Sequence, residues 1–209
     1  AAEEAGIIHL VTTRVLAQIA QDLPRIVALD SEFHVAVNLS ADDLYASDTV
    51  PLLRATVSAS GVDARHLQIE VTERGFMRTD AAREAVRAIR GIGIRVAVDD
   101  FGTGYSSLSY LELFELDLLK IDKSFVDTIG QGAATSQVVP HIIEMAKSLR
   151  LQMVAEGIES QAQADYLGQR GVRYGQGWLY ARPMPLETLL QRLRQLRERP
   201  AIPPSPHAG

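Results

Sequence analysis

Short apolar runs alternate with longer stretches of helical periodicity along most of this chain. Six apolar runs are expected to be strands: 33–38, 66–71, 94–99, 116–121, 151–156 and a short run at 172–177. Most of them are apolar at nearly every position, which is typical of parallel strands covered on both faces. The alternation with helical stretches predicts strand–helix–strand units and therefore an α/β fold.

Local signals mark the ends of two helices between these strands. Asp48 precedes a helical stretch that Gly61 follows, so we expect Asp48 to cap this helix and Gly61 to end it. Thr79 or Asp80 is expected to open the next helix, and Gly91 is expected to close it.

Three more helices are predicted. Ser160 and Gln163 have the spacing of a capping box, which starts a helix after residue 160. A helical stretch over 134–149 contains Pro140, so this helix should be kinked or should begin later. The first segment carries an apolar stripe at helical spacing, formed by Ile7, Ile8, Val11, Val15 and Ile19.

The number of strands indicates an incomplete barrel. A closed (β/α)8 barrel has eight strands and typically about 250 residues, whereas this chain has 209 residues and six predicted strands. We therefore expect a TIM-like (β/α)8 barrel over residues 1–198 that lacks its first one or two strands. Residues 199–209 are rich in proline and have no periodicity, so they are expected to be a disordered tail or linker.

Composition narrows the classes of function. The net charge is −5 and the pI is near 5.6, which argues against a polynucleotide held along many phosphates. The chain has no cysteine, so disulfides and thiolate metal sites are excluded. No apolar run has the length of a membrane span and the first residues do not resemble a signal peptide, so we expect no membrane contact by this chain and a cytoplasmic location.

Polar or ionisable side chains follow every predicted strand. They are Asn38, Glu70, Glu73, Asp99, Asp100, Lys120, Asp122, Glu156, Glu159 and Gln176. A single residue of this kind often caps the next helix, but the carboxyl ends of parallel barrel strands meet at one mouth, so recurrence on six strands favours a shared site. Two carboxylates 4 Å apart repel by about 4 kcal/mol at an effective dielectric constant near 20. Raised pKa values or bound cations must relieve this repulsion, and oxygen ligands suit Mg²⁺ or Mn²⁺.

Asp99 and Asp100 are adjacent, so on a regular strand their side chains would point to opposite faces. Gly102 and Gly104 follow directly and permit a sharp turn that re-aims Asp100. An ordinary strand-to-helix loop is the structural alternative. The five histidines fall in helical stretches, at strand starts or in the tail, and are expected to be structural or exposed.

Six segments in this order resemble the EAL domain family of cyclic-di-GMP phosphodiesterases. They are VNLSADDL at 37–44, IEVTE at 69–73, DDFGTGYSSL at 99–108, LLKID at 118–122, VAEGIES at 154–160 and GQGWLYARPMP at 175–185. Together they extend over nearly the whole chain, so the resemblance is specific. The family's Glu-Ala-Leu motif is expected to lie before residue 1, and Trp178 stands where Tyr or Phe is usual.

The resemblance implies a role for each strand-end residue. It implies two divalent ions, Mg²⁺ or Mn²⁺, with Asn38, Glu70, Asp99 and Asp100 as ligands. It implies that Lys120 polarises the attacking water, that Asp122 and Glu156 share in catalysis, and that Gln176, Glu73 and Glu159 support the substrate or the ligands. Glu73 is also expected to hold the loop formed by Phe101, Gly102, Thr103 and Gly104, which couples dimerisation to metal binding.

The function implied is hydrolysis of cyclic di-GMP to linear pGpG, in a homodimer attached to an upstream sensor or GGDEF-type domain. One alternative is a catalytically inactive module that binds cyclic di-GMP or a protein partner. A second alternative, a barrel phosphodiesterase for another small phosphodiester, lacks the histidine pair expected at such a site.

Overall fold

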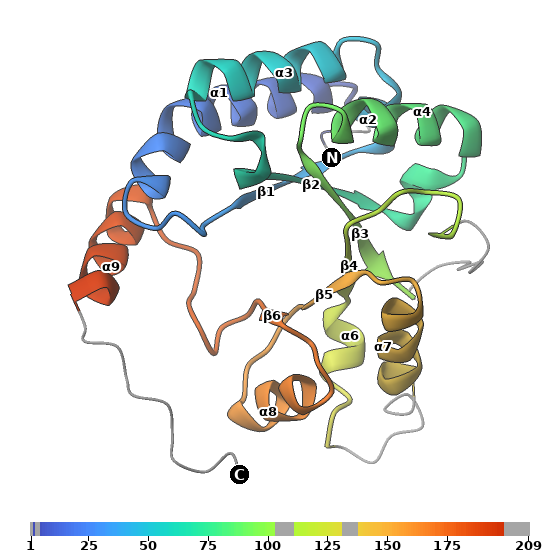
Figure 1. Cartoon of the computed structure of the whole chain (residues 1–209), viewed down its shortest axis with the longest axis vertical. Coiled ribbons are helices and arrows are strands. Elements are labelled where there is room, and N and C mark those ends of the chain that lie inside the picture. Colours follow the sequence, from blue (N-terminus) through green and yellow to red (C-terminus); the bar gives the residue numbers. More distant parts are fainter. Residues whose placement is uncertain (1, 3–4, 103–110, 131–137, 199–209) are drawn as a thin grey trace.

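The structure is a computed structural model, and it describes residues 2, 5–102, 111–130 and 138–198. Six parallel strands form one sheet in which each strand pairs with the next along the chain. The strands are β1 (Val35–Leu39), β2 (Leu67–Thr72), β3 (Arg95–Phe101), β4 (Leu118–Ile121), β5 (Gln152–Ala155) and β6 (Tyr174–Gly175). The sheet curls as part of a barrel wall (Figure 1). All six predicted strands are confirmed.

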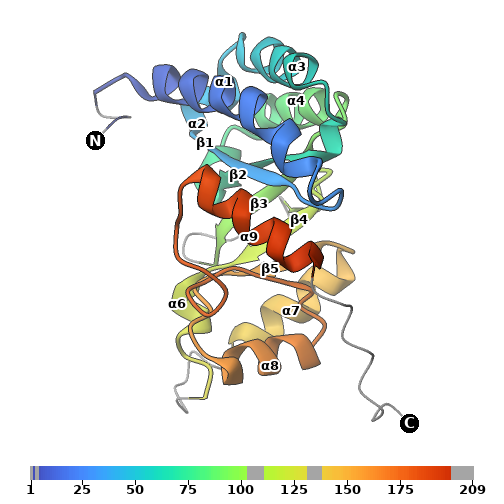
Figure 2. The same cartoon turned by 90° about the vertical axis from the view of Figure 1, so that its left-hand side faces the viewer.

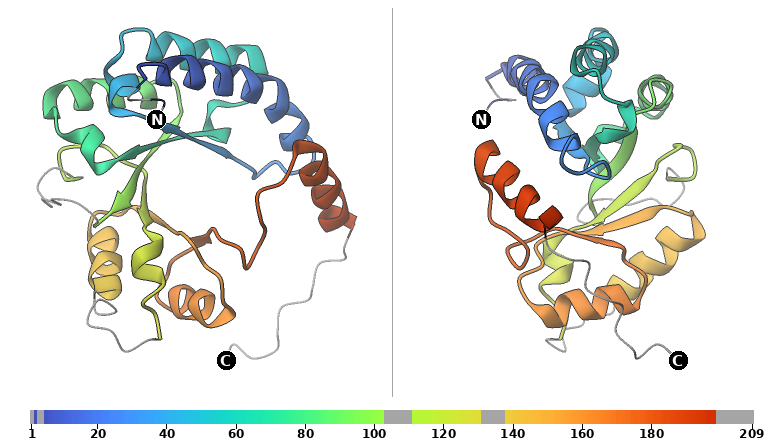
Figure 3. Two further views of the ribbon diagram at one scale, coloured as in Figure 1. Left: turned by 180° about the vertical axis from the view of Figure 1, so that it is seen from behind. Right: turned by 60° about the vertical axis from the view of Figure 1, so that its left-hand side comes forward.

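Helices cover the outside of the sheet. They are α1 (Ile8–Val27), α2 (Ala41–Tyr45), α3 (Thr49–Ser60), α4 (Thr79–Arg90), α6 (Lys123–Val126), α7 (Val138–Ser148), α8 (Gln161–Gln169) and α9 (Leu186–Glu198), with 3₁₀ turns η1 (Ala64–His66) and η2 (Glu73–Phe76). Figures 1 and 3 show α1 to α4 over the first strands and α6 to α8 over the last. Figure 2 shows α9 crossing between these two groups, beside the end of α1.

The two sides of each strand have different chemistry. Apolar side chains such as Ile69, Val98 and Leu119 are fully buried in the main core between the sheet and its helices. Residues that alternate with them, including Glu70 and Lys120, are also buried but are polar. Because successive strand residues point to opposite faces, the inner face of the curled sheet carries the polar chemistry.

The cap predictions had different outcomes. Ser160 and Gln163 form the predicted capping box at the start of α8, and Gly61 ends α3 in the left-handed conformation at φ 65°. The prediction for Asp48 was wrong, because its side chain makes no capping hydrogen bond. The Asp48 carboxylate instead lies 3.0 Å from Nε2 of His9, which holds the start of α1 near the start of α3.

One further helix agrees with the sequence at both of its ends. Helix α4 begins at Thr79 and is followed by Gly91, whose φ of −63° is right-handed, so this position does not require glycine for its conformation. The described part of helix α7 runs from Val138 to Ser148 and contains Pro140, whereas residues 134–137 of the predicted helix lie outside the described residues.

The first helix forms as predicted, but its apolar stripe is not its buried face. Thr12, Leu16, Leu23 and Ile26 are buried, whereas Ile7, Val11 and Val15 are 47%, 43% and 40% exposed. Among the described residues, no helix combines the length and apolar character needed to cross a bilayer.

Candidate metal centre

Three carboxylates from two different strands meet at the mouth of the curled sheet. Asp99, Asp100 and Glu156 each offer an oxygen atom, and these atoms lie within 4.8 Å of one another. The aspartates lie in the last residues of β3, and Glu156 follows β5. The sheet therefore brings together residues more than fifty positions apart, as expected for the carboxyl ends of parallel strands.

A buried lysine lies among these carboxylates. The side chain of Lys120 is 4% exposed, and its Nζ lies 2.5 Å from Oε2 of Glu70, 2.9 Å from Oδ1 of Asp99 and 2.6 Å from Oε1 of Glu156. Burial by itself lowers the pKa of Lys120, but Glu70, Glu156 and Asp99 outweigh burial and raise that pKa above its usual range. Lys120 therefore carries a positive charge. Glu70 also accepts a hydrogen bond of 3.1 Å from Nε2 of Gln68, a buried partner that the sequence did not indicate.

The backbone turns at Asp100 itself. This residue has a left-handed φ of 51°, and the pairing register of β3 with β4 shifts between Val98 and Phe101. The amide of Asp100 donates a 2.9 Å hydrogen bond to Oδ1 of Asp99. The sequence predicted positive φ at the following glycines, and Gly102 does have a φ of 95°, but it did not predict the left-handed conformation of Asp100 itself. Left-handed conformations of residues other than glycine cost about 1–3 kcal/mol and are concentrated at functional sites.

The mouth retains excess negative charge. Burial raises the pKa of Asp100, and the nearby carboxylate of Asp99 raises it further. Burial also raises the pKa of Glu156, although Lys120 partly offsets this effect. One ammonium group does not balance this set of carboxylates. A hard divalent cation fits this donor set, since all of the ligand atoms are oxygens. The positive charge of the cation would also offset the repulsion between the carboxylates.

Other predicted residues border this cluster. Asn38 lies on β1 in register with Glu70 on β2. Gln176 follows β6, and its backbone amide donates a 2.8 Å hydrogen bond to the backbone carbonyl of Ala155. Both residues therefore stand at strand ends that neighbour the strands with Glu70 and Glu156.

Glu73 lies just after β2, at the start of η2. Its Oε1 accepts a 2.7 Å hydrogen bond from the amide of Gly102. This bond ties the segment after β2 to the segment after the two aspartates. Phe101 is 4% exposed and belongs to the core, while Thr103 and Gly104 lie outside the described residues.

Two predicted residues have local partners of their own. Asp122 caps α6 by accepting a 2.9 Å hydrogen bond from the amide of Ser124, although its charge still raises the pKa of Asp100. Glu159 pairs with Lys123 at 2.9 Å. Asp122 thus has the helix-capping role that any single strand-end carboxylate can have.

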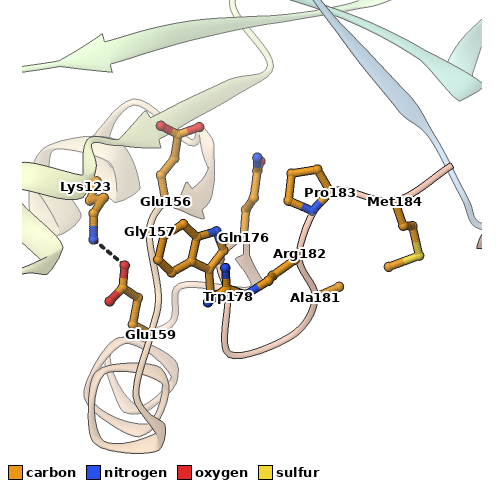
Figure 4. Close-up of a pocket in the computed structure, with 11 residues that line it drawn as sticks. Lys123, Glu156, Gly157, Glu159, Gln176, Trp178, Ala181, Arg182, Pro183 and Met184 are labelled. Carbon is orange, nitrogen blue, oxygen red and sulfur yellow. Dashed lines mark hydrogen bonds and ion pairs between the residues drawn. The ribbon is translucent and has the colours of Figure 1, made fainter.

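A cavity of about 520 Å³ adjoins the carboxylates (Figure 4). Its lining includes Lys123, Glu156, Glu159, Gln176, Trp178 and Arg182. Sequence reasoning did not assign Lys123, Trp178 or Arg182 to the site, because none of them is at a strand end.

The chain matches the EAL domain family over residues 1–183. It therefore belongs to the EAL domain family. This membership agrees with the fold, since EAL domains are TIM-like barrels and the six parallel strands form most of such a wall.

Two curated relatives are named as a cyclic di-GMP phosphodiesterase or a probable one. The chain is 40% identical over 190 residues to the probable cyclic di-GMP phosphodiesterase PdeB of Escherichia coli, a match that covers 91% of this chain and 36% of PdeB. It is 36% identical over 198 residues to the cyclic di-GMP phosphodiesterase NbdA of Pseudomonas aeruginosa, covering 94% of this chain and 25% of NbdA. The chain thus spans about a quarter to a third of the length of these relatives.

Solved structures agree with the family and the fold. The PaMucR phosphodiesterase in complex with c-di-GMP superposes with a TM-score of 0.83 at 34% identity, covering 90% of this chain and 83% of that one. The EAL domain of Mycobacterium smegmatis DcpA superposes with a TM-score of 0.85 at 28% identity, covering 90% and 86% of the two chains.

Proposed function

We propose that this chain hydrolyses cyclic di-GMP to linear pGpG with Mg²⁺ or Mn²⁺ as cofactor. The observation that carries the proposal is the convergence of Asp99, Asp100 and Glu156 within 4.8 Å around the mouth of the barrel wall. Relatives whose names state this activity, at 36–40% identity over most of the chain, support it.

The ligand set follows from the strand ends. Asn38, Glu70, Asp99 and Asp100 would hold two ions, all through oxygen atoms. When bound, two such ions supply a water of lowered pKa and stabilise negative charge on the phosphoryl and leaving oxygens.

Lys120 and Glu156 contribute fixed charge and a proton acceptor. The ammonium group of Lys120 contacts Glu70, Asp99 and Glu156, so it holds these three carboxylates in place. A carboxylate with a raised pKa accepts a proton more readily, and burial raises the pKa of Glu156.

The same proposal includes the wider assembly. Because the chain spans about a third of the length of PdeB, we place it beside a sensor or GGDEF-type domain in a longer cytoplasmic protein. The Glu73–Gly102 hydrogen bond joins the segment after β2 to the segment after β3. It would transmit the geometry of a homodimer to the neighbouring aspartates.

Product analysis tests the function. The purified chain is incubated with cyclic di-GMP and Mg²⁺ or Mn²⁺, and pGpG is quantified by chromatography. We expect pGpG from the wild type and at least a hundredfold loss in Glu156→Gln. Glu144→Gln is the matched control, because Glu144 lies on the exposed surface of α7 and its ion pair among the described residues is with Lys147.

Absence of pGpG with either metal would contradict hydrolysis by this chain. Calorimetry with cyclic di-GMP then distinguishes the alternative functions. Binding without turnover indicates a receptor module, and no binding indicates a protein-interaction module.

A further inference from the structure

We propose that the end of the barrel wall opposite the carboxylates binds a phosphate dianion between basic side chains at the starts of the strands. We call this place the anion site and define it by His34, Arg65, His66, Arg95 and Arg173. The proposal does not depend on the proposed function, because the anion site lies at the amino ends of the strands and the candidate metal centre lies at their carboxyl ends.

Basic residues stand at the starts of four of the six strands. His34 directly precedes β1, His66 directly precedes β2, Arg95 is the first residue of β3, and Arg173 directly precedes β6. The amino ends of parallel barrel strands meet at one mouth, just as their carboxyl ends meet at the other. These side chains accordingly line one cavity of about 400 Å³, and Arg65 lines it as well.

The guanidinium group of Arg95 has a buried N–H without a partner. Among the residues that the structure describes, its Nε makes no hydrogen bond and Arg95 makes no ion pair. Arg90 shows the usual arrangement, since it donates hydrogen bonds of 3.1 and 2.9 Å to Asp117 and one of 2.9 Å to Glu115. Leaving a buried donor unpaired costs free energy. An oxyanion offers the acceptor oxygens that suit a guanidinium group.

Positive charge is in excess around the cavity. Arg65 and Arg173 are exposed, and neither forms an ion pair within the described part of the chain. Glu32 is the one carboxylate among the described residues that line the cavity. Because arginine stays protonated in proteins, three guanidinium groups face one carboxylate. A doubly charged anion would balance the charge that remains.

The two histidines can add further donors. Nδ1 of His66 lies 2.7 Å from the carbonyl oxygen of Phe33, and Nδ1 of His34 lies 3.3 Å from the carbonyl oxygen of Glu32. A carbonyl only accepts hydrogen bonds, so Nδ1 carries the proton in both rings. The other ring nitrogen, Nε2, becomes a donor once the ring is protonated. Both histidines can therefore bind an anion as imidazolium groups.

The surrounding charge also acts on His34. Burial lowers the pKa of His34, and the positive charges of Arg95 and His66 lower it further, whereas the hydrogen bond with the Glu32 carbonyl and the charge of Asp30 partly offset this effect. A bound anion favours the charged form of a nearby imidazole. Binding at the anion site should therefore raise the pKa of His34.

Calorimetry with small anions tests the proposal. The chain is titrated in EDTA, at constant ionic strength, with inorganic phosphate, ribose 5-phosphate and acetate. EDTA removes divalent ions, so the carboxylates at the other mouth repel these anions. We expect phosphate to bind and acetate, a single charge, to bind at least about tenfold more weakly. Ribose 5-phosphate identifies the source of the group: tighter binding than phosphate indicates a phosphate ester, and equal or weaker binding indicates the free ion.

Variants locate the binding. Arg95→Gln should weaken phosphate binding at least about tenfold, because it removes a charged donor from the centre of the site. Arg173→Gln changes an exposed side chain, so it should fold normally and weaken binding about threefold. Arg54→Gln is the matched control, because Arg54 lies on the exposed surface of α3 and does not line the cavity. This variant should bind phosphate like the wild type.

NMR spectroscopy gives a readout that a purely structural role of these residues would not change. Sulfate, which keeps both charges where histidine titrates, should raise the pKa of His34, and acetate at the same ionic strength should not. The anion site is overturned if phosphate does not bind, if Arg95→Gln and Arg173→Gln bind it as tightly as Arg54→Gln, or if sulfate leaves the pKa of His34 unchanged. Equal binding of acetate and phosphate would overturn the assignment of a dianion. None of these outcomes depends on whether the chain forms pGpG.

Discussion

The single residue that most determines the electrostatics of the site is Lys120. It is almost completely buried and contacts Glu70, Asp99 and Glu156 at once. In a medium of low dielectric constant, charges that lose their counterion are penalised far more than they would be in water. We therefore expect Lys120 to stabilise the fold at low divalent-ion concentration.

Replacing Lys120 by methionine should reveal this dependence. We expect Lys120→Met to lower the free energy of unfolding in EDTA by about 3–5 kcal/mol, because three buried carboxylates lose their counterion. Urea unfolding followed by circular dichroism measures the change. Lys147→Met removes an exposed pair with Glu144 and should cost about 0–1 kcal/mol. Equal effects of the two substitutions would show that Lys120 does not balance the cluster.

At the scale of elements, the site depends on backbone hydrogen bonds and close packing between the loops that follow β5 and β6. The amide of Ile158 donates a 3.0 Å hydrogen bond to the carbonyl of Gln176, and the amide of Leu179 donates one of 3.0 Å to the carbonyl of Ile158. Between them, Gly177 passes so close that a Cβ would lie 2.1 Å from the carbonyl oxygen of Ile158. Glycine is required here because backbone, rather than a movable side chain, occupies the space.

Substitution of this glycine should separate the two loops. We expect Gly177→Ala to destabilise the chain by about 1–3 kcal/mol through steric overlap and to impair binding of cyclic di-GMP, because Gln176 and Trp178 flank it. Gly168→Ala serves as the comparison: this glycine is inside α8 and nothing lies within 4 Å of its Cβ position. That change should stabilise the helix by about 0.5–1 kcal/mol. Thermal denaturation of both variants tests whether the two changes in stability have opposite signs.

At the scale of the whole molecule, the candidate metal centre links β2, β3, β4 and β5. Glu70, Asp99 and Glu156 come from three of these strands, and Lys120 joins them from the fourth. A ligand that binds this site in the folded state alone must stabilise the whole sheet by mass action.

Divalent ions should therefore raise the melting temperature. At about one hundred times the dissociation constant, Mg²⁺ or Mn²⁺ should raise it by about 5–10 °C over EDTA. Asp99→Asn should abolish most of this shift. Asp165→Asn, on the exposed surface of α8, should retain it. Differential scanning fluorimetry gives the comparison, and an equal shift in both variants would place the ions elsewhere.

Apolar runs and local signals determined the elements of this protein. Strands such as 66–71 and 94–99 were identifiable because they are apolar at nearly every position, as expected of parallel strands that are buried on both faces. The capping box of Ser160 and Gln163 and the left-handed Gly61 depend only on near neighbours, so they too followed from sequence. The strand-end carboxylates were evident because parallel strands place all of their carboxyl ends at one mouth.

Only the tertiary structure decided which side chains meet. That Asp48 contacts His9, and that the Ile7, Val11 and Val15 stripe is exposed, depend on packing between distant elements. The left-handed turn at Asp100 and the three contacts of Lys120 likewise arise from the register of β3 and β4. Local sequence determines which helix, strand or turn each segment can form. Strand pairing and burial then select among side-chain contacts whose free energies differ by little.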